Sequence, residues 1–148
     1  MIAWAVWSSL TIGVLGQGPS SEEEYIKANY SKFEYRIEMR DGVELFTVVY
    51  TPNDVSREYP ILLYRTPYSC SPYGADQYRS ALGPSHRFAR DGYIFVYQDI
   101  RGRYGSEGKF SMLRTPVSAD KNVQVDEATD TYDTVEWLLN NLDNHNNK

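Results

Sequence analysis

The fold of this chain is decided by the stretch Asp91-Gly-Tyr-Ile-Phe-Val-Tyr-Gln-Asp-Ile-Arg-Gly-Arg-Tyr-Gly-Ser-Glu-Gly108. Its first part, Tyr93 to Tyr97, is an uncharged run of aromatic and β-branched residues that follows Asp91-Gly92. Such a run favours a strand that is covered on both faces, because a half-exposed strand would alternate polar and apolar residues. We therefore predict that this strand is central in its sheet.

Glycine and charged residues crowd into the loop after this strand. Ligands of open α/β sheets bind beyond the carboxyl ends of the strands, so a site is expected on this side. The Gly-x-x-Gly-x-x-Gly repeat from Gly102 predicts tight turns, since the lysine and the helix start of a phosphate-binding loop are missing. We expect ion pairs among Arg101, Arg103 and Glu107, and we expect Asp99 to fix the loop by hydrogen bonds to backbone.

The composition is that of a single globular domain. The chain has 148 residues, of which 41% are hydrophobic and 24% charged, and its 13 tyrosines indicate large packed surfaces with polar tips. A net charge of -5 without a basic run argues against nucleic acid as a partner. One cysteine, Cys70, and two histidines, His86 and His145, leave little material for a disulfide or a metal site, so no cofactor or metal is predicted.

Residues 1–16 form an apolar, uncharged segment that ends in Val14-Leu15-Gly16, which resembles a signal-peptide cleavage site. This pattern favours a signal peptide and a secreted or periplasmic protein. The positively charged start of a signal is missing, so an apolar extension or a misplaced start codon, with a cytoplasmic protein, stays open. The run is short for a bilayer, so no stable membrane span is expected.

Residues 17–32 are predicted to form a linker and a short helix, because Ser21 and Glu24 make a capping-box pattern before Glu22–Asn29. Alternating residues, apolar runs and a 3.6-residue repeat predict the remaining elements of a domain at 33–148. These are strands at Phe33–Met39, Val43–Tyr50, Pro60–Tyr64 and Tyr93–Tyr97, and helices at Pro84–Arg90 and Asp126–Asn141.

Two local signals refine this order of elements. Asp41-Gly42 predicts a hairpin turn in which both residues can take positive φ. In the last helix, an apolar stripe follows the 3.6-residue repeat; its members are Thr129, Tyr132, Val135, Leu138, Leu139 and Leu142. A hairpin followed by alternating strands and helices predicts an α/β fold with a mixed sheet.

Several short motifs, in order, resemble one family, the Xaa-Pro dipeptidyl-peptidase-like serine hydrolases, which include cocaine esterase, glutaryl acylases and α-amino acid ester hydrolases. The resemblance runs from about Tyr25 to Asn141, and Tyr64–Gly74 is most similar to the α-amino acid ester hydrolases. The motifs are Met39-Arg-Asp-Gly-Val43, Arg65-Thr-Pro-Tyr68, Leu82-Gly-Pro-Ser85, Asp91-Gly-Tyr93, Gln98-Asp-Ile-Arg-Gly-Arg-Tyr104, Ser106-Glu-Gly108 and Asp130-Thr-Tyr-Asp-Thr134.

The resemblance implies the N-terminal part of an α/β-hydrolase fold, in which an antiparallel hairpin leads into a parallel sheet. It also implies a Ser-Asp-His triad whose serine lies in a Gly-x-Ser-Tyr-x-Gly elbow after the helix at Asp126–Asn141. The 148 residues contain no Gly-x-Ser-x-Gly pattern, so we expect an N-terminal fragment, truncated before the nucleophile elbow and inactive alone. In this fold the fourth strand lies between the second and third, which leaves Ile61–Tyr64 with an open edge and favours association of copies.

One catalytic residue follows from the resemblance. Tyr68 matches the family tyrosine that donates its hydroxyl to the oxyanion hole, an interaction worth on the order of 3 kcal/mol in the transition state. The plainer interpretation is a packed loop tyrosine. Ser69, Ser85 and Ser106 are expected to be turn serines, because no motif places a base beside them.

The predicted function is therefore hydrolysis of a small ester or amide substrate by the complete enzyme. The alternative is a non-catalytic binding module that uses the long Tyr-, Ser-, Pro- and Gly-rich loop Ser69–Gly83 as its contact surface. The DNA beyond codon 148 distinguishes the two, because only the hydrolase requires a nucleophile elbow there.

Overall fold

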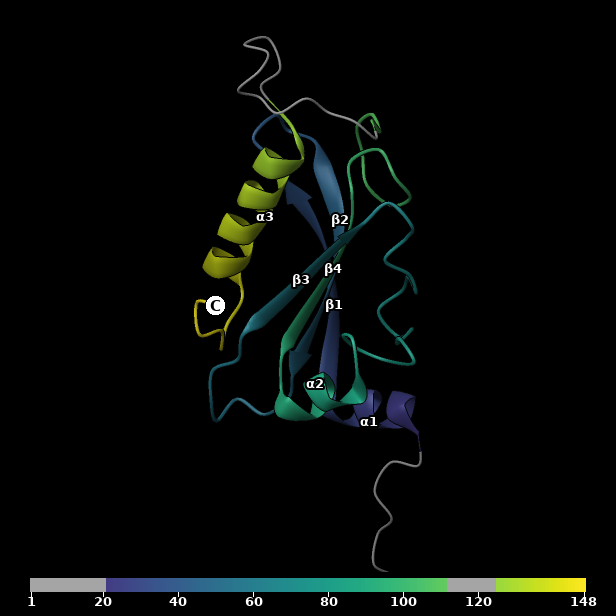
Figure 1. The fold of residues 1–148 in the computed structure, drawn as a ribbon, viewed down its shortest axis with the longest axis vertical. Coiled ribbons are helices and arrows are strands. Elements are labelled where there is room, and N and C mark those ends of the chain that lie inside the picture. The colour runs from purple at the N-terminus through teal and green to yellow at the C-terminus, as the bar shows by residue number, and fades with distance from the viewer. Residues whose placement is uncertain (1–20, 112–124) are drawn as a thin grey trace, which may run out of the picture.

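A computed structural model of the chain describes residues 21–111 and 125–148. They form one four-stranded mixed sheet with three helices (Figure 1). The elements are α1 (Glu22–Asn29), β1 (Tyr30–Glu38), β2 (Glu44–Pro52), β3 (Ile61–Thr66), α2 (His86–Asp91), β4 (Ile94–Asp99) and α3 (Glu127–Asn141).

The strand order is β1-β2-β4-β3. β2 pairs antiparallel with both β1 and β4, whereas β3 and β4 run parallel. The fourth strand thus lies between the second and the third, as predicted, and β3 is at the edge of the sheet among the described strands. All six residues of β4 are buried, which confirms that the apolar run at Tyr93–Tyr97 marks a central strand.

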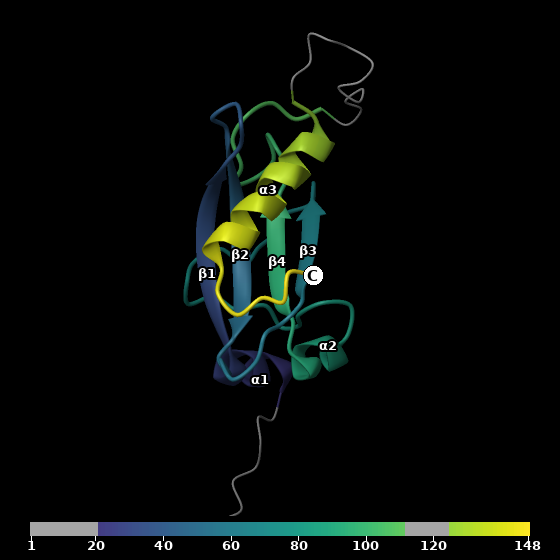
Figure 2. The same cartoon turned by 90° about the vertical axis from the view of Figure 1, so that its left-hand side faces the viewer.

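Helices cover both faces of the sheet. Figure 2 shows α3 lying diagonally across one face, with α1 and α2 at the lower end of the sheet. Alternate residues of β4 point to opposite sides, so Ile94 and Val96 meet α3 while Phe95 and Tyr97 meet the other two helices. The face on the α1 and α2 side is called the aromatic face; its core is Ile26, Tyr30, Val48, Tyr50, Cys70, Leu82, Ala89, Phe95 and Tyr97. The opposite side is called the α3 face; its core is Ile37, Met39, Leu45, Val49, Tyr59, Ile94, Val96, Leu138 and Leu142.

Local signals fix the ends of the helices. In α1 the Ser21 hydroxyl accepts the Glu24 N–H at 3.2 Å while the Glu24 carboxylate accepts the Ser21 N–H at 3.1 Å, which confirms the capping box. Gly92 ends α2 with a left-handed φ of 84°. An added Cβ there would lie 2.6 Å from the Tyr59 ring, so glycine is required on two grounds.

The hairpin turn differs from the prediction. Only Gly42 takes a positive φ, 81°, whereas Asp41 does not. The Gly42 N–H donates to Met39 O at 2.8 Å and the Met39 N–H donates to Val43 O at 2.9 Å. This arrangement is a type I turn followed by one left-handed residue, so the chain reverses with a single residue at positive φ.

The face that α3 buries matches the predicted stripe only in part. Leu138 and Leu142 are buried as predicted, and Asp130 and Thr134 turn inward with them, whereas Tyr132 is 62% exposed and Val135 and Leu139 are exposed as well. Polar groups of the sheet explain why Asp130 and Thr134 turn inward. These two buried side chains make hydrogen bonds to groups that a leucine would leave unpaired.

The end of the chain pairs with the residues that precede β3. The Tyr59 N–H donates to Asn144 O at 2.7 Å, and the Asn146 N–H donates to Tyr59 O at 3.0 Å, which forms a parallel bridge. The Ile61 N–H donates to Lys148 O at 2.7 Å. In the described ranges no helix has the length and hydropathy to cross a bilayer. The predicted signal segment 1–16 lies outside them.

Candidate functional site

The candidate site lies where β3 and β4 end. Because these strands are parallel, with Thr66 opposite Asp99, their carboxyl ends lie side by side. The segment after β3 carries Tyr68, and the glycine-rich loop follows β4. The Ile100 N–H donates to Thr66 O at 3.1 Å and joins the two exits. This is the position predicted for a site in an open α/β sheet.

The backbone around Tyr68 is fixed while its side chain is free. The Tyr68 N–H donates to Thr66 Oγ1 at 3.0 Å, and Arg103 Nε donates to Pro67 O at 3.0 Å. The next residue, Ser69, has a left-handed φ of 83°, a conformation that costs a residue other than glycine energy and is found mostly at functional sites. Tyr68 itself is 80% exposed. Its hydroxyl is therefore carried by a rigid segment and faces solvent.

The carboxylate of Asp99 holds this segment through hydrogen bonds. The buried carboxylate accepts the Cys70 N–H at 2.7 Å, the Tyr73 hydroxyl at 2.9 Å and the Gly105 N–H at 3.1 Å. Ser106 Oγ donates to the Asp99 carbonyl at 2.6 Å. These bonds confirm that Asp99 fixes the loop through backbone groups, and they leave its carboxylate no free face for acid–base work.

The groups beside Asp99 keep their protons. Burial, reinforced by the negative charge of Asp99, raises the pKa of the Cys70 thiol to about 12. Burial also raises the pKa of Tyr73 to about 12; the hydrogen bond from Ser69 opposes this rise and the one to Asp99 adds to it. Cys70 is therefore a neutral packing residue at physiological pH, not a nucleophile.

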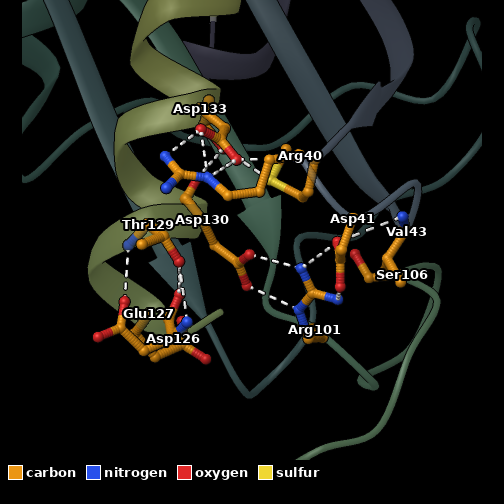
Figure 3. Close-up of polar contacts among 12 residues, drawn as sticks. Arg40, Asp41, Val43, Arg101, Ser106, Asp126, Glu127, Thr129, Asp130 and Asp133 are labelled. Atoms are coloured by element: carbon orange, nitrogen blue, oxygen red, sulfur yellow. Dashed lines mark hydrogen bonds and ion pairs between the residues drawn. The ribbon is translucent and has the colours of Figure 1, made fainter. Parts of the chain in front are cut away.

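Arg101 is the centre of a buried ion network (Figure 3). Its Nε and Nη2 donate to the Asp130 carboxylate at 2.9 and 2.6 Å, and its Nη1 and Nη2 donate to Asp41 at 2.8 and 3.0 Å. The hydrogen bonds that Arg101 donates to Asp130 raise the pKa of Arg101 above its ordinary value. Burial opposes ionisation of Asp41, but Arg101 outweighs it and holds the pKa of that carboxyl below its usual range. The network ties the hairpin, α3 and the exit of β4 together.

The prediction of ion pairs among Arg101, Arg103 and Glu107 is therefore wrong. Glu107 accepts the Glu44 N–H at 3.3 Å instead of pairing with an arginine. Arg103 stacks on Tyr104 and Phe110, with its guanidinium carbon 5.1 and 4.9 Å from the ring centroids. The partners of Arg101 and Glu107 come from other elements, which the spacing within the loop cannot reveal, whereas Arg103 stacks on rings of the loop itself.

The glycines of the loop do make tight turns, as predicted. Gly102 and Gly108 have φ of 69° and 87°. A Cβ on Gly102 would lie 2.1 Å from the Phe110 nitrogen, so no larger residue fits.

Ser69, Ser106 and His145 have structural partners, and Ser85 and His86 lie away from the site. Ser69 Oγ lies 2.9 Å from the Tyr73 hydroxyl, and Ser106 Oγ accepts the Phe46 N–H at 2.8 Å. Ser85 is the N-cap of α2, and His86 follows it at the opposite end of β4 from the site. His145 Nε2 lies 3.1 Å from Leu139 O. Across residues 21–111 and 125–148, no cluster of three or more His, Cys, Asp or Glu side chains suits a metal ion.

An apolar groove lies on the aromatic face, away from Tyr68 and beside β3. Its volume is about 810 Å³. The groove is lined by β3, β4 and the loop Ser69–Gly83, through residues that include Leu62, Tyr64, Pro72, Tyr78, Phe95 and Tyr97.

The sequence profile of the X-Pro dipeptidyl-peptidase (S15) family matches residues 41–148. The chain belongs to this family. It is 35% identical over 115 residues to cocaine esterase of Rhodococcus sp. (strain MB1 Bresler), a match that covers 77% of this chain and 18% of the esterase. The fold and the family thus agree with the motifs on which the resemblance was based.

Two solved structures resemble the fold. An α-amino acid ester hydrolase superposes with a TM-score of 0.65 and 35% identity, over 96% of this chain and 24% of that one. An aminopeptidase from the marine sediment archaeon Thaumarchaeota archaeon superposes with a TM-score of 0.63 and 32% identity, over 95% of this chain and 23% of that one. This family member therefore has the fold of the N-terminal part of an α/β hydrolase, and it spans a quarter or less of the length of these relatives.

Proposed function

We propose that this chain forms the N-terminal part of a serine hydrolase that cleaves ester or amide bonds, and that Tyr68 donates a hydrogen bond to the oxyanion. The observation that carries the proposal is the exposed phenol on a rigid backbone at the carboxyl end of β3, in a chain of the S15 family. The serine, aspartate and histidine of the triad are supplied by sequence beyond Lys148.

The chemistry assigns Tyr68 a role in both halves of the reaction. A serine hydroxyl, deprotonated by histidine, adds to the substrate carbonyl and gives a tetrahedral oxyanion. The Tyr68 hydroxyl donates to that oxygen, and the intermediate collapses with loss of the alcohol or amine, which takes the proton from histidine. Histidine then takes a proton from water as the water oxygen adds to the acyl-enzyme, and the same donor stabilises the second oxyanion. This intermediate collapses by breaking the bond to serine, which takes the proton from histidine, and the acid is released.

The first test is the reading frame. The DNA beyond codon 148 is expected to encode Gly-x-Ser-Tyr-x-Gly soon after α3. The chain of 148 residues is expected to show no turnover of an activated amino acid ester. Turnover by the isolated chain would contradict the division of the machinery that we propose.

The second test is Tyr68→Phe in the enzyme that carries this chain. Removal of one oxyanion donor is expected to lower kcat by about 10²-fold with little change in KM, because the bond forms only in the transition state. Tyr104→Phe is the matched control, since Tyr104 is an exposed tyrosine that follows β4. An unchanged kcat for Tyr68→Phe would refute the role of this residue.

A second candidate function rests on the groove. The loop Ser69–Gly83 provides about half of its lining, which supports a binding module that uses this loop without catalysis. A stop codon directly after Lys148, with no hydrolase sequence downstream, would favour this candidate over the first.

A further inference from the structure

A lysine at the opposite edge of the sheet from β3 is buried beneath the loop that follows Tyr68. Lys32 belongs to β1, which is separated from β3 by β2 and β4. The side chain of Lys32 is fully buried. A buried ammonium is costly unless all of its donors are bonded, so the partners of Lys32 show what it is for.

All three donors of this ammonium have an oxygen partner. Lys32 Nζ donates to Pro72 O at 2.8 Å, to Gly74 O at 2.7 Å and to Glu34 Oε1 at 2.9 Å. The same Glu34 oxygen accepts the Gly74 N–H at 2.7 Å. Two of the three partners are thus backbone carbonyls of a loop forty residues away in sequence. Lys32 and Glu34 together clamp the backbone on either side of Tyr73.

Tyr73 passes this constraint on to the candidate site. Its ring packs edge-on against Phe46, with the centroids 5.3 Å apart, and its hydroxyl bonds both Asp99 and Ser69 at 2.9 Å. Ser69 Oγ also accepts the Ser71 N–H at 3.1 Å. The left-handed Ser69 is therefore held from the loop side, and it is the residue directly after Tyr68.

We propose that Lys32 is a positioning residue for Tyr68: by clamping Pro72 and Gly74 it sets Tyr73, which locks Ser69 and so the backbone from which the Tyr68 side chain projects. The effect of Lys32 on catalysis rests on the proposed function, whereas its hold on the backbone at Ser69 does not. Sequence alone gives no sign of it, because a lysine in an edge strand is ordinarily solvated.

The structural test uses Lys32→Met in the chain of 148 residues, followed by amide hydrogen exchange. Loss of the charged hydrogen bonds is expected to speed exchange at Tyr68 and Cys70 by about tenfold or more, with no change at Val96 in the centre of the sheet. Lys27→Met is the matched control, because Lys27 is exposed on α1 and pairs only with Glu23. Equal acceleration at all three amides, or none at Tyr68 and Cys70, would overturn the proposal.

A second variant covers the case in which Lys32→Met does not fold. Glu34→Gln keeps the shape of the side chain and weakens the contacts of its oxygen with Lys32 and Gly74. It is expected to raise exchange at the same two amides by a smaller factor. An unchanged exchange at Tyr68 and Cys70 in this variant would also overturn the proposal.

The catalytic test is a double-mutant cycle in the enzyme that carries this chain. Lys32→Met is expected to lower kcat by roughly tenfold, with KM nearly unchanged, and to have almost no effect when Tyr68 is already phenylalanine. The same loss in both backgrounds would show that Lys32 acts by general stability. An ineffective Tyr68→Phe would refute the proposed function alone, since the exchange result still decides whether Lys32 holds the segment.

Discussion

The two faces of the sheet are held by different forces. On the aromatic face, tyrosine and phenylalanine rings pack against each other, and their hydroxyls bond backbone groups at the margin, as Tyr30 does with Ala89 O at 2.8 Å. On the α3 face, a buried polar layer joins the helix to the sheet through Arg101, Asp130 and Gln98. Apolar packing tolerates small shifts, whereas bidentate bonds accept one geometry.

The comparison shows how the candidate site gains its precision. The polar layer lies under the carboxyl ends of β3 and β4, where the exit loops begin. Arg65 Nε donates to Gln98 Oε1 at 2.7 Å and so ties the end of the edge strand β3 to the end of the central strand β4. The aromatic face supplies most of the burial of large rings, and the α3 face sets the orientation of the ends of β3 and β4. The loop after Tyr68 is held separately, by Lys32 and Asp99.

The largest effect is expected for Asp130→Ala. This change removes the bidentate partner of Arg101 and leaves a buried guanidinium with Asp41 only, which costs about 3–5 kcal/mol in the free energy of unfolding. Urea unfolding measures the loss. Asp133→Ala in the same helix is the control and should cost less, because its partner Arg40 is 43% exposed. Similar losses for the two variants would mean that the buried network does not hold α3.

A smaller effect is expected for Gln98→Leu. The change leaves Arg65 Nε, Thr47 Oγ1 and Thr134 Oγ1 without the amide that bonds them, at a cost of about 2–3 kcal/mol. Tyr97→Phe on the other face of the same strand should cost no more than about 1.5 kcal/mol, because the ring stays in place and only the hydrogen bond from the Gly83 N–H is lost. If thermal melting ranks these two variants the other way, the contrast between the faces fails.

The smallest effect at neutral pH is expected for Tyr50→Phe on the aromatic face. The Tyr50 hydroxyl accepts the Arg79 N–H at 3.2 Å, a bond worth about 1 kcal/mol. In strong alkali the variant should become relatively more stable, because burial raises the pKa of Tyr50 to about 12 from 10.0.

The sign of this pH dependence follows from proton binding. The folded state retains the Tyr50 proton more tightly than the unfolded state, so this contribution to stability is complete below pH 10.0 and is lost as the pH rises towards 12. Cys70, with a pKa of about 12 against 9.0, acts in the same direction. Between pH 8 and 12, the melting temperature should fall less steeply with rising pH for Tyr50→Phe than for the parent chain. An equal fall of the two melting temperatures would contradict this assignment.

The features that the sequence predicted well depend on nearby residues or on burial along one strand. The capping box of Ser21 and Glu24, the stop at Gly92 and the uncharged run before Gln98 each act within a few positions. Helix α3 was predicted at the correct place, but only Leu138 and Leu142 of its apolar stripe are buried, because the stripe was weighed without the polar groups that the sheet presents to Asp130 and Thr134.

The amino-acid sequence by itself determined the order of the elements, the central strand and the ends of the helices, because short-range sterics and hydrophobic periodicity suffice for these. Its motifs indicated the hydrolase family by resemblance. Only the tertiary structure decided that Arg101 joins Asp41 to Asp130, that α3 turns Tyr132 outward and that Lys32 clamps a loop across the sheet. The contacts of Arg101 and Lys32 are buried polar contacts between distant segments, and their partners are chosen when the chain closes and water is excluded.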